Sequence, residues 1–248
     1  MYLSPAPPRV LAHRGLAIDA PENSMLAFLR AIVLGCTHVE TDVHASSDGI
    51  AVICHDDDLM RIAGRPERPR QLSMARLAEI PIGHDQTLCS LSEALDAFPD
   101  TRFNIDIKSG DAVLPTVQAI RDAKARDRVL ITSFNERRRR AAVELLPGVA
   151  TSASAPRFVA ALLAAASGSD VALRGTLRGL HALQVPEKTL GLAVSSPRLI
   201  DSFHRAGVEV HIWTVNEVDD MARLFDAGVD GLVTDRADLA LRLLATGD

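Results

Sequence analysis

Eight short apolar segments recur along this chain, and each precedes a stretch in which apolar residues are spaced three and four apart. Apolar runs that alternate with amphipathic helices are typical of parallel strands joined by right-handed crossovers. Eight such units can close on themselves, so the pattern predicts an α/β fold of the TIM (β/α)8 barrel type, with a doubly wound open sheet as the alternative. The expected strands are 10–12, 39–43, 102–107, 129–132, 149–152, 181–185, 209–215 and 231–234.

The expected helices each have one apolar face and connect these strands. For the first helix we expect Asn23 as the N-cap and an end before Gly35. Because 248 residues match the size of one such barrel, we expect a single catalytic domain over residues 1–248. The helices are expected at 25–33, 91–98, 113–125, 136–146, 158–166, 199–206, 218–227 and 239–243.

A small insertion is expected after the second strand. That strand begins at residue 39 and the third begins at residue 102, about twice the largest spacing between other neighbouring strands. The turn signal Asp48-Gly49 precedes an additional strand over 50–54. The residues from about 56 to 88 are then expected to form a short insertion rather than a second domain.

Charge and hydropathy exclude several kinds of partner. With 27 basic and 32 acidic residues, the surface carries no broad positive field for a nucleic acid. The longest apolar run, 158–166, is too short to span a bilayer, and the start of the chain lacks a signal-peptide pattern. We therefore expect a cytoplasmic protein without stable membrane insertion, as a monomer or a homodimer. The arginine run 137–140 is expected to form a solvated helix face.

Carboxylates occupy strand positions where a buried parallel strand should be apolar. Glu40 and Asp42 are two residues apart on the second strand, so both side chains point to one face. Two buried carboxylates repel each other unless a cation neutralises them, and Mg²⁺ or Ca²⁺ prefers oxygen ligands. Asp106 on the next strand supplies a third oxygen donor. The sequence therefore predicts one divalent cation there, and the alternative is a structural network in which these carboxylates pair with Arg14 and Lys108.

Two histidines follow strands at the same rim. His13 ends the first strand, and His55 ends the additional strand. Histidines beside a carboxylate cluster can transfer protons near neutral pH, so both are expected to be catalytic. Arg14 and Lys108 supply the positive charge that a phosphoryl group needs, Arg14 with its forked guanidinium and Lys108 as a point charge.

The motifs, in their order and spacing, resemble those of the glycerophosphodiester phosphodiesterase family over nearly the whole chain. They are His13-Arg14-Gly15, Pro21-Glu22-Asn23-Ser24, Glu40-Thr41-Asp42-Val43, Asp48-Gly49, His55-Asp56, Ser133-Phe134, Trp213-Thr214-Val215-Asn216, Gly228-Val229-Asp230-Gly231 and Thr234-Asp235. The resemblance implies a barrel enzyme, a phosphoric diester hydrolase, that converts glycerophosphodiesters to glycerol 3-phosphate and an alcohol with a divalent metal and two histidines as general acid and base.

The resemblance also assigns roles to single positions. His13 and His55 match the acid/base histidines, Glu40 and Asp42 match metal ligands, and Trp213 matches an aromatic residue that lines the substrate site. Arg14 and Lys108 match the cations that contact the phosphate. Where the family's third strand carries glutamate, this chain has the shorter Asp106, so the identity and affinity of the metal are open. Gln184, at the end of the expected sixth strand, is a further candidate for substrate contact.

Two other functions remain as alternatives. The first is a lysophospholipase D or sphingomyelinase D-like activity on the same scaffold. Such enzymes need membrane contact, and the chain has no evident apolar anchor or basic amphipathic helix. The second is a non-catalytic barrel that binds phosphate or metal, which the two histidines oppose. The sequence leaves open which histidine is the base, and whether water or the glycerol hydroxyl attacks first.

Overall fold

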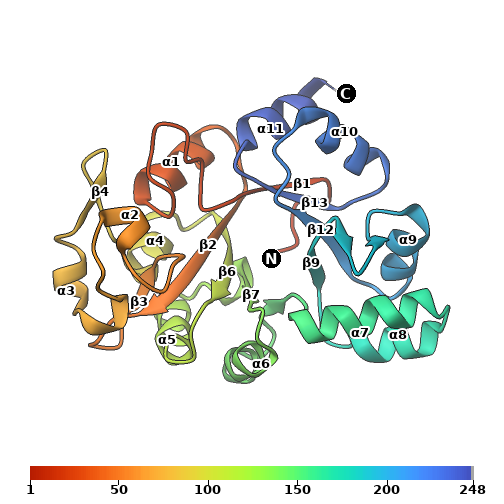
Figure 1. Ribbon diagram of the computed structural model, residues 1–248, viewed down its shortest axis with the longest axis horizontal. Coiled ribbons are helices and arrows are strands. Elements are labelled where there is room, and N and C mark those ends of the chain that lie inside the picture. The colour runs from red at the N-terminus through yellow and green to blue at the C-terminus, as the bar shows by residue number, and fades with distance from the viewer. Residues whose placement is uncertain (247–248) are drawn as a thin grey trace.

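The computed structural model describes residues 1–246, and in them eight parallel strands form the predicted barrel (Figure 1). Hydrogen bonds connect the strands in the order β8-β7-β6-β2-β1-β13-β12-β9, and a parallel bridge between Ser152 and Ala182 joins the two end strands. The alternative of an open doubly wound sheet is therefore wrong. The strands are β1 (Arg9–Ala12), β2 (His38–Ala45), β6 (Arg102–Ile107), β7 (Val129–Thr132), β8 (Ala150–Thr151), β9 (Ala182–Pro186), β12 (Glu209–Trp213) and β13 (Gly231–Thr234).

All eight predicted helices surround this barrel, with ends within a few residues of the expected ones. One further helix, α8 (Asp170–Leu177), was not expected and lies beside α7 (Figure 1). Its sequence contains Gly175 and β-branched residues, which weaken a local helix signal, while Leu173 and Leu177 are buried by tertiary packing. The eight predicted helices are α1 (Met25–Val33), α4 (Leu91–Ala97), α5 (Val113–Asp122), α6 (Glu136–Leu145), α7 (Ala155–Ala166), α9 (Pro197–Arg205), α10 (Val218–Asp226) and α11 (Ala237–Thr246).

The start of α1 differs from the expectation. Ser24, not Asn23, is the N-cap, because Ser24 Oγ accepts a hydrogen bond from Ala27 N at 3.1 Å. Asn23 has a positive φ of 55° and turns its side chain toward the barrel instead. Its amide nitrogen donates to Asp42 Oδ2 at 3.0 Å, and its amide oxygen accepts from Thr41 Oγ1 at 2.8 Å. Both residue types cap helices well, so only these long-range contacts distinguish them.

The arginine run 137–140 on α6 is only partly solvated. Arg137 and Arg140 are exposed as expected, but Arg139 is buried. Its guanidinium binds both carboxylate oxygens of Glu136 at 2.8 Å and donates to Thr151 Oγ1 at 3.2 Å. The expectation of a solvated face is therefore wrong for Arg139. This side chain connects α6 with β8.

The insertion packs against the β2 side of the barrel. β3 (Ala51–Ile53) pairs antiparallel with the end of β2, which delivers His55 to the barrel rim. The segment that follows has a small core of its own, formed by Val52, Cys54, Leu59, Leu77, Ile80, Ile82 and Leu88. Its remaining elements are α2 (Met60–Ala63), a 3-10 turn (Pro69–Gln71), α3 (Met74–Leu77), β4 (Pro81–Gly83) and β5 (Gln86–Thr87); a second hairpin, β10 (Lys188–Thr189) with β11 (Leu192–Ala193), follows β9.

The N-terminal segment closes the end of the barrel opposite the polar strand ends, where Tyr2 packs near the starts of β7 and β9. Tyr2 is buried there, and its carbonyl oxygen lies 2.9 Å from Nε2 of His38. Arg9 donates from Nε and Nη2 to the two carboxylate oxygens of Glu209, each at 2.8 Å, and His211 Nε2 lies 3.0 Å from Glu209. This end of the barrel is thus filled by internally paired charges, as expected of a structural face.

No helix within residues 1–246 is long and apolar enough to cross a membrane. The last two residues of the expected domain, 247 and 248, lie outside the described part of the chain.

Candidate active site

A cavity of about 190 Å³ opens at the carboxyl ends of the barrel strands. Parallel strands bring their carboxyl ends to one rim, which is where active sites of such barrels lie. All nine site residues expected from the sequence line this cavity: His13, Arg14, Glu40, Asp42, His55, Asp106, Lys108, Gln184 and Trp213. Asn104, Thr132, Phe134, Thr214 and Val233 complete its lining.

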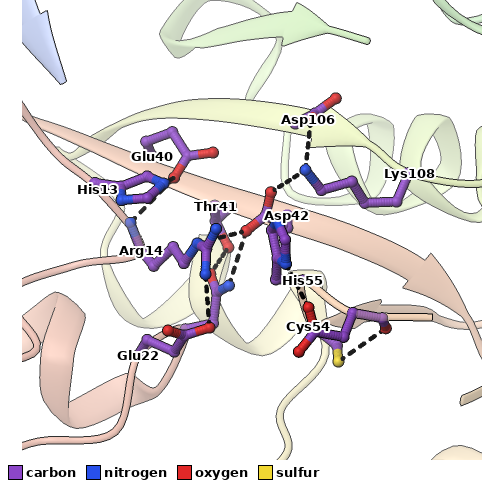
Figure 2. A network of polar contacts seen from close by, with 12 residues as sticks. His13, Arg14, Glu22, Glu40, Thr41, Asp42, Cys54, His55, Asp106 and Lys108 are labelled. Atoms are coloured by element: carbon purple, nitrogen blue, oxygen red, sulfur yellow. Dashed lines mark hydrogen bonds and ion pairs between the residues drawn. The ribbon is translucent and has the colours of Figure 1, made fainter. Parts of the chain in front are cut away.

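Lys108 lies between two of the carboxylates (Figure 2). Its Nζ is 2.8 Å from Asp42 Oδ1 and 2.7 Å from Asp106 Oδ2. Burial favours the neutral form of Asp42, but the charge and hydrogen bond of Lys108 outweigh it and lower the pKa of this carboxyl. For Asp106, burial dominates and its pKa is raised. One ammonium therefore does not fully compensate the two carboxylates.

Among the described residues, no lysine or arginine side chain pairs with Glu40. Its carboxylate accepts a hydrogen bond from the backbone N–H of Arg14 at 3.0 Å, and Nε2 of His13 lies 4.0 Å away. Burial, followed by the negative charge of Asp42, raises the pKa of Glu40 to about 8. Burial disfavours the ionised form of this carboxylate, so a cation bound beside it would stabilise that form.

The oxygen atoms at the cavity wall suit a hard cation in their chemistry. Asp106 Oδ1 and Asn104 Oδ1 are buried and have no hydrogen-bond partner among the described residues. Such orphaned acceptors are rare in folded proteins and indicate an additional binding partner. Within residues 1–246, no three acidic, histidine or cysteine side chains are already gathered around a common ion position.

His13 is held by a carboxylate that the sequence reasoning did not assign to the site. Its Nδ1 lies 2.7 Å from Asp235 Oδ1, and Asp235 Oδ2 accepts from Asn216 Nδ2 at 2.9 Å. Burial of His13 disfavours its charged form, but Asp235 and Glu40 outweigh this effect and raise its pKa. The signal for Asp235 was its position directly after the last strand, where parallel strands present their site residues.

His55 has a different partner. Its Nδ1 lies 2.6 Å from Asp56 Oδ1, and Asp56 Oδ2 accepts from Arg61 Nε at 2.6 Å. Arg61 also donates to Glu22 Oε1 at 2.6 Å, and the same oxygen accepts from Arg14 Nη1 at 2.9 Å. Alternating charges thus connect the expected phosphate ligand Arg14 with the expected catalytic His55 through the insertion, and the sequence reasoning missed this connection.

The remaining candidates form the apolar side of the cavity. Trp213 and Phe134 meet edge to face with ring centroids 5.9 Å apart. Gln184 lines the cavity, but it lies in the middle of β9 rather than at its end, and its Nε2 is 3.3 Å from His211 Nδ1. Because the side chain points into the barrel, this mid-strand position still reaches the cavity.

Comparison with known proteins places this site in a family. The profile described as "Glycerophosphoryl diester phosphodiesterase family" matches residues 13–239. A protein of Mycobacterium tuberculosis named "Probable glycerophosphodiester phosphodiesterase 2" is 43% identical over 242 residues, covering 96% of this chain and 91% of that protein. The chain belongs to the glycerophosphoryl diester phosphodiesterase family. The predicted family and enzyme class, a phosphoric diester hydrolase, are thereby confirmed.

Known structures of this family have the same fold. The glycerophosphodiester phosphodiesterase of Thermotoga maritima is 26% identical, with a TM-score of 0.76 over 94% of this chain and 97% of that one. A phosphodiesterase of Oleispira antarctica, determined in complex with the product sn-glycerol-3-phosphate, has a TM-score of 0.81 at 23% identity over 96% of this chain and 97% of that one. These similarities confirm the predicted barrel, whereas the roles of the individual site residues stay predictions.

Proposed function

We propose that this protein hydrolyses glycerophosphodiesters to glycerol 3-phosphate and an alcohol by histidine acid/base catalysis with a divalent metal. The observation that carries this proposal is the pair of histidines, each bound to a carboxylate, on one cavity that also contains Arg14 and Lys108. The 43% identical relative and the family membership support the same substrate class. The expected state, a monomer or a homodimer, stays a prediction.

His13 and His55 are the proposed proton-transfer pair. One of them removes the proton from the attacking hydroxyl, and the other donates a proton to the leaving alcohol. Asp235 and Asp56 bind the Nδ1 atoms, so the Nε2 atoms are the ones that exchange protons with the substrate. Which histidine begins as the base is open.

Arg14 and Lys108 are the proposed phosphate ligands. The guanidinium of Arg14 already has Glu22 as an anionic partner, and its Nε lies 3.3 Å from Asp42. Both cations are partly buried, where a charge interacts more strongly with a phosphoryl group than it does in water. They bind the diester and stabilise the negative charge that develops on its oxygens.

We also propose that Glu40, Asp42 and Asp106 hold one divalent cation, Mg²⁺ or Ca²⁺. The supporting observations are the raised pKa values of Glu40 and Asp106 and the unpartnered Oδ1 of Asp106. When bound, the ion would act as a Lewis acid toward a phosphoryl oxygen. Lys108 occupies oxygens of Asp42 and Asp106 that the ion would share, so its ammonium would be available to the phosphate if these carboxylates held the ion.

Glycerophosphocholine hydrolysis tests this function. We expect turnover that falls at least 100-fold after chelation, returns with Mg²⁺ or Ca²⁺, and is equally reduced in His13→Ala. His204→Ala is the matched control, because His204 lies on α9 and pairs with Asp230 away from the cavity. Full activity in the chelated enzyme or in His13→Ala would contradict the mechanism. Turnover of dispersed lysolipid alone would favour the lysophospholipase D alternative, and phosphate binding without any turnover would favour the non-catalytic one.

A further inference from the structure

A second cavity, of about 210 Å³, borders the catalytic one. The two cavities share four lining residues, Thr132, Phe134, Gln184 and Trp213. The aromatic pair and these two polar side chains therefore lie at the boundary between the catalytic cavity and the second one. A diester that is bound by Arg14 and Lys108 can reach across this boundary with one of its two ester groups.

The two cavities differ in chemistry. Charged side chains dominate the catalytic cavity, whereas all thirteen described residues that line the second one are uncharged. Its apolar wall, which we call the apolar subsite, consists of Phe134, Phe158, Val159, Val185, Pro186 and Trp213. Such a wall gains free energy when an apolar group displaces water from it.

Phe134 lies at the boundary between the two cavities, and its side chain is exposed. The residue is 58% exposed although it meets Trp213 edge to face. A large aromatic residue in this position is covered when a ligand occupies the cavity beside it. A trimethylammonium group would also be attracted to aromatic rings. Half of the residues of the apolar subsite are aliphatic, however, and no carboxylate among the described lining residues would neutralise a cation.

The size of the cavity limits the group that fits. Apolar protein cavities of about 150 Å³ hold one benzene ring. A cavity of about 210 Å³ therefore encloses a single aromatic ring or a short alkyl chain, whereas the long acyl chain of a lysolipid would extend beyond it. The subsite therefore favours short alcohol groups over the long-chain substrates of the lysophospholipase D alternative.

We propose that the apolar subsite binds the leaving alcohol of the diester, and that this alcohol is a short alkyl or single-ring aryl group. The inference rests on the proposed function, because the phosphate must lie beside Arg14 and Lys108. A hydroxyl oxygen, from water or from the glycerol of the substrate, forms a bond to phosphorus and gives its proton to one histidine, while the phosphorus–oxygen bond to the leaving alcohol breaks and the alcohol oxygen takes a proton from the other histidine. Where the glycerol hydroxyl attacks, water then opens the cyclic phosphate. The alkyl or aryl group then leaves from the subsite while glycerol 3-phosphate remains in the polar cavity.

A series of glycerophosphate diesters with methyl, propyl, hexyl, phenyl and choline alcohols tests this proposal. In the wild type, kcat/KM should rise at least tenfold from the methyl to the hexyl or phenyl ester, since each buried methylene contributes up to about fourfold. Val159→Trp fills the cavity from α7 and should abolish this rise, so that kcat/KM of the hexyl and phenyl esters falls to about that of the methyl ester. Leu163→Trp, at an exposed position of the same helix, is the matched control and should behave as the wild type.

Several outcomes would overturn the subsite. Measurable turnover with the same kcat/KM for every ester would contradict the subsite but not the proposed function. An equal loss of kcat/KM for every ester in Val159→Trp would do the same. A strong preference for choline, or for a long-chain lysolipid over the hexyl ester, would do the same. Absence of turnover for all diesters would overturn the proposed function as well. Ala155→Leu, at the exposed start of α7, is a second filling variant that decides the question should Val159→Trp fail to fold.

Discussion

His13 and His55 differ in the charge that surrounds their carboxylate partners. Asp235, the partner of His13, accepts its second hydrogen bond from the neutral amide of Asn216. Asp56, the partner of His55, is shared with the guanidinium of Arg61. Asp235 therefore retains more negative charge for its histidine, which agrees with the raised pKa of His13. The carboxylate that holds His13 thus favours the protonated form of this histidine.

Asp235→Asn tests this difference. The substitution removes the anionic acceptor of His13 Nδ1, so the pKa of His13 falls and its tautomer is no longer fixed. We expect kcat to fall by about 10- to 100-fold with a smaller change in KM, and the limb of the pH profile that reports His13 to move to lower pH. Asp230→Asn, which breaks the pair with the exposed His204, is the control. An unchanged kcat and pH profile would show that Asp235 does not act through His13.

At the scale of elements, the short helix α2 links two strand-end loops. Arg61 on α2 binds Asp56, which follows β3, and Glu22, which precedes α1. Because Glu22 also binds Arg14, Arg61 connects the Arg14 side of the cavity with its His55 side. This gives the insertion a positioning role in addition to covering the flank of the barrel.

Arg61→Ala tests that role. The variant leaves Glu22 and Asp56 without their common cation, so Arg14 and His55 lose their fixed spacing, and we expect kcat/KM to fall roughly tenfold. Arg61 is half exposed, so the unfolding free energy should change by less than about 0.5 kcal/mol. Arg65→Ala is the matched control, because Arg65 lies in the same insertion and its side chain pairs with Glu67 alone among residues 1–246. Equal activities of the two variants would contradict the positioning role, and Arg61→Lys should recover part of the activity.

At the scale of the whole molecule, periodicity predicted most of the fold. The eight strands and the charged residues of the site could be predicted because strand parity and strand ends are local properties of the sequence, whereas Trp213 was predicted from the resemblance to the family. The contacts that were missed join distant positions, such as His13 with Asp235, 222 residues apart, and Arg61 with Glu22, 39 apart. The choice of Ser24 over Asn23 as the cap depends in the same way on tertiary contacts, which a single sequence does not encode in any local pattern.

The closed end of the barrel gives the molecule a pH-dependent stability that is independent of catalysis. Burial favours the neutral form of Glu209, but hydrogen bonds from Arg9 and His211 outweigh it and lower its pKa to about 2. Because this value lies below the ordinary 4.5, the stabilisation is complete above pH 4.5 and is lost as the pH falls toward 2. With the side chain largely buried, the contribution at neutral pH is about 2 kcal/mol.

Glu209→Gln removes this titration while keeping the side chain's shape. Urea unfolding at several pH values between 2 and 7 should give a wild-type unfolding free energy that falls more steeply in acid than that of the variant, by about 2 kcal/mol over the range. At pH 7 the variant should be the less stable protein, because Arg9 stays buried without its anionic partner. Glu144→Gln, in an exposed pair with Arg140 on α6, should leave the acid dependence unchanged. Parallel pH curves for the wild type and Glu209→Gln would show that the paired charges at the closed end do not carry the acid sensitivity of the barrel.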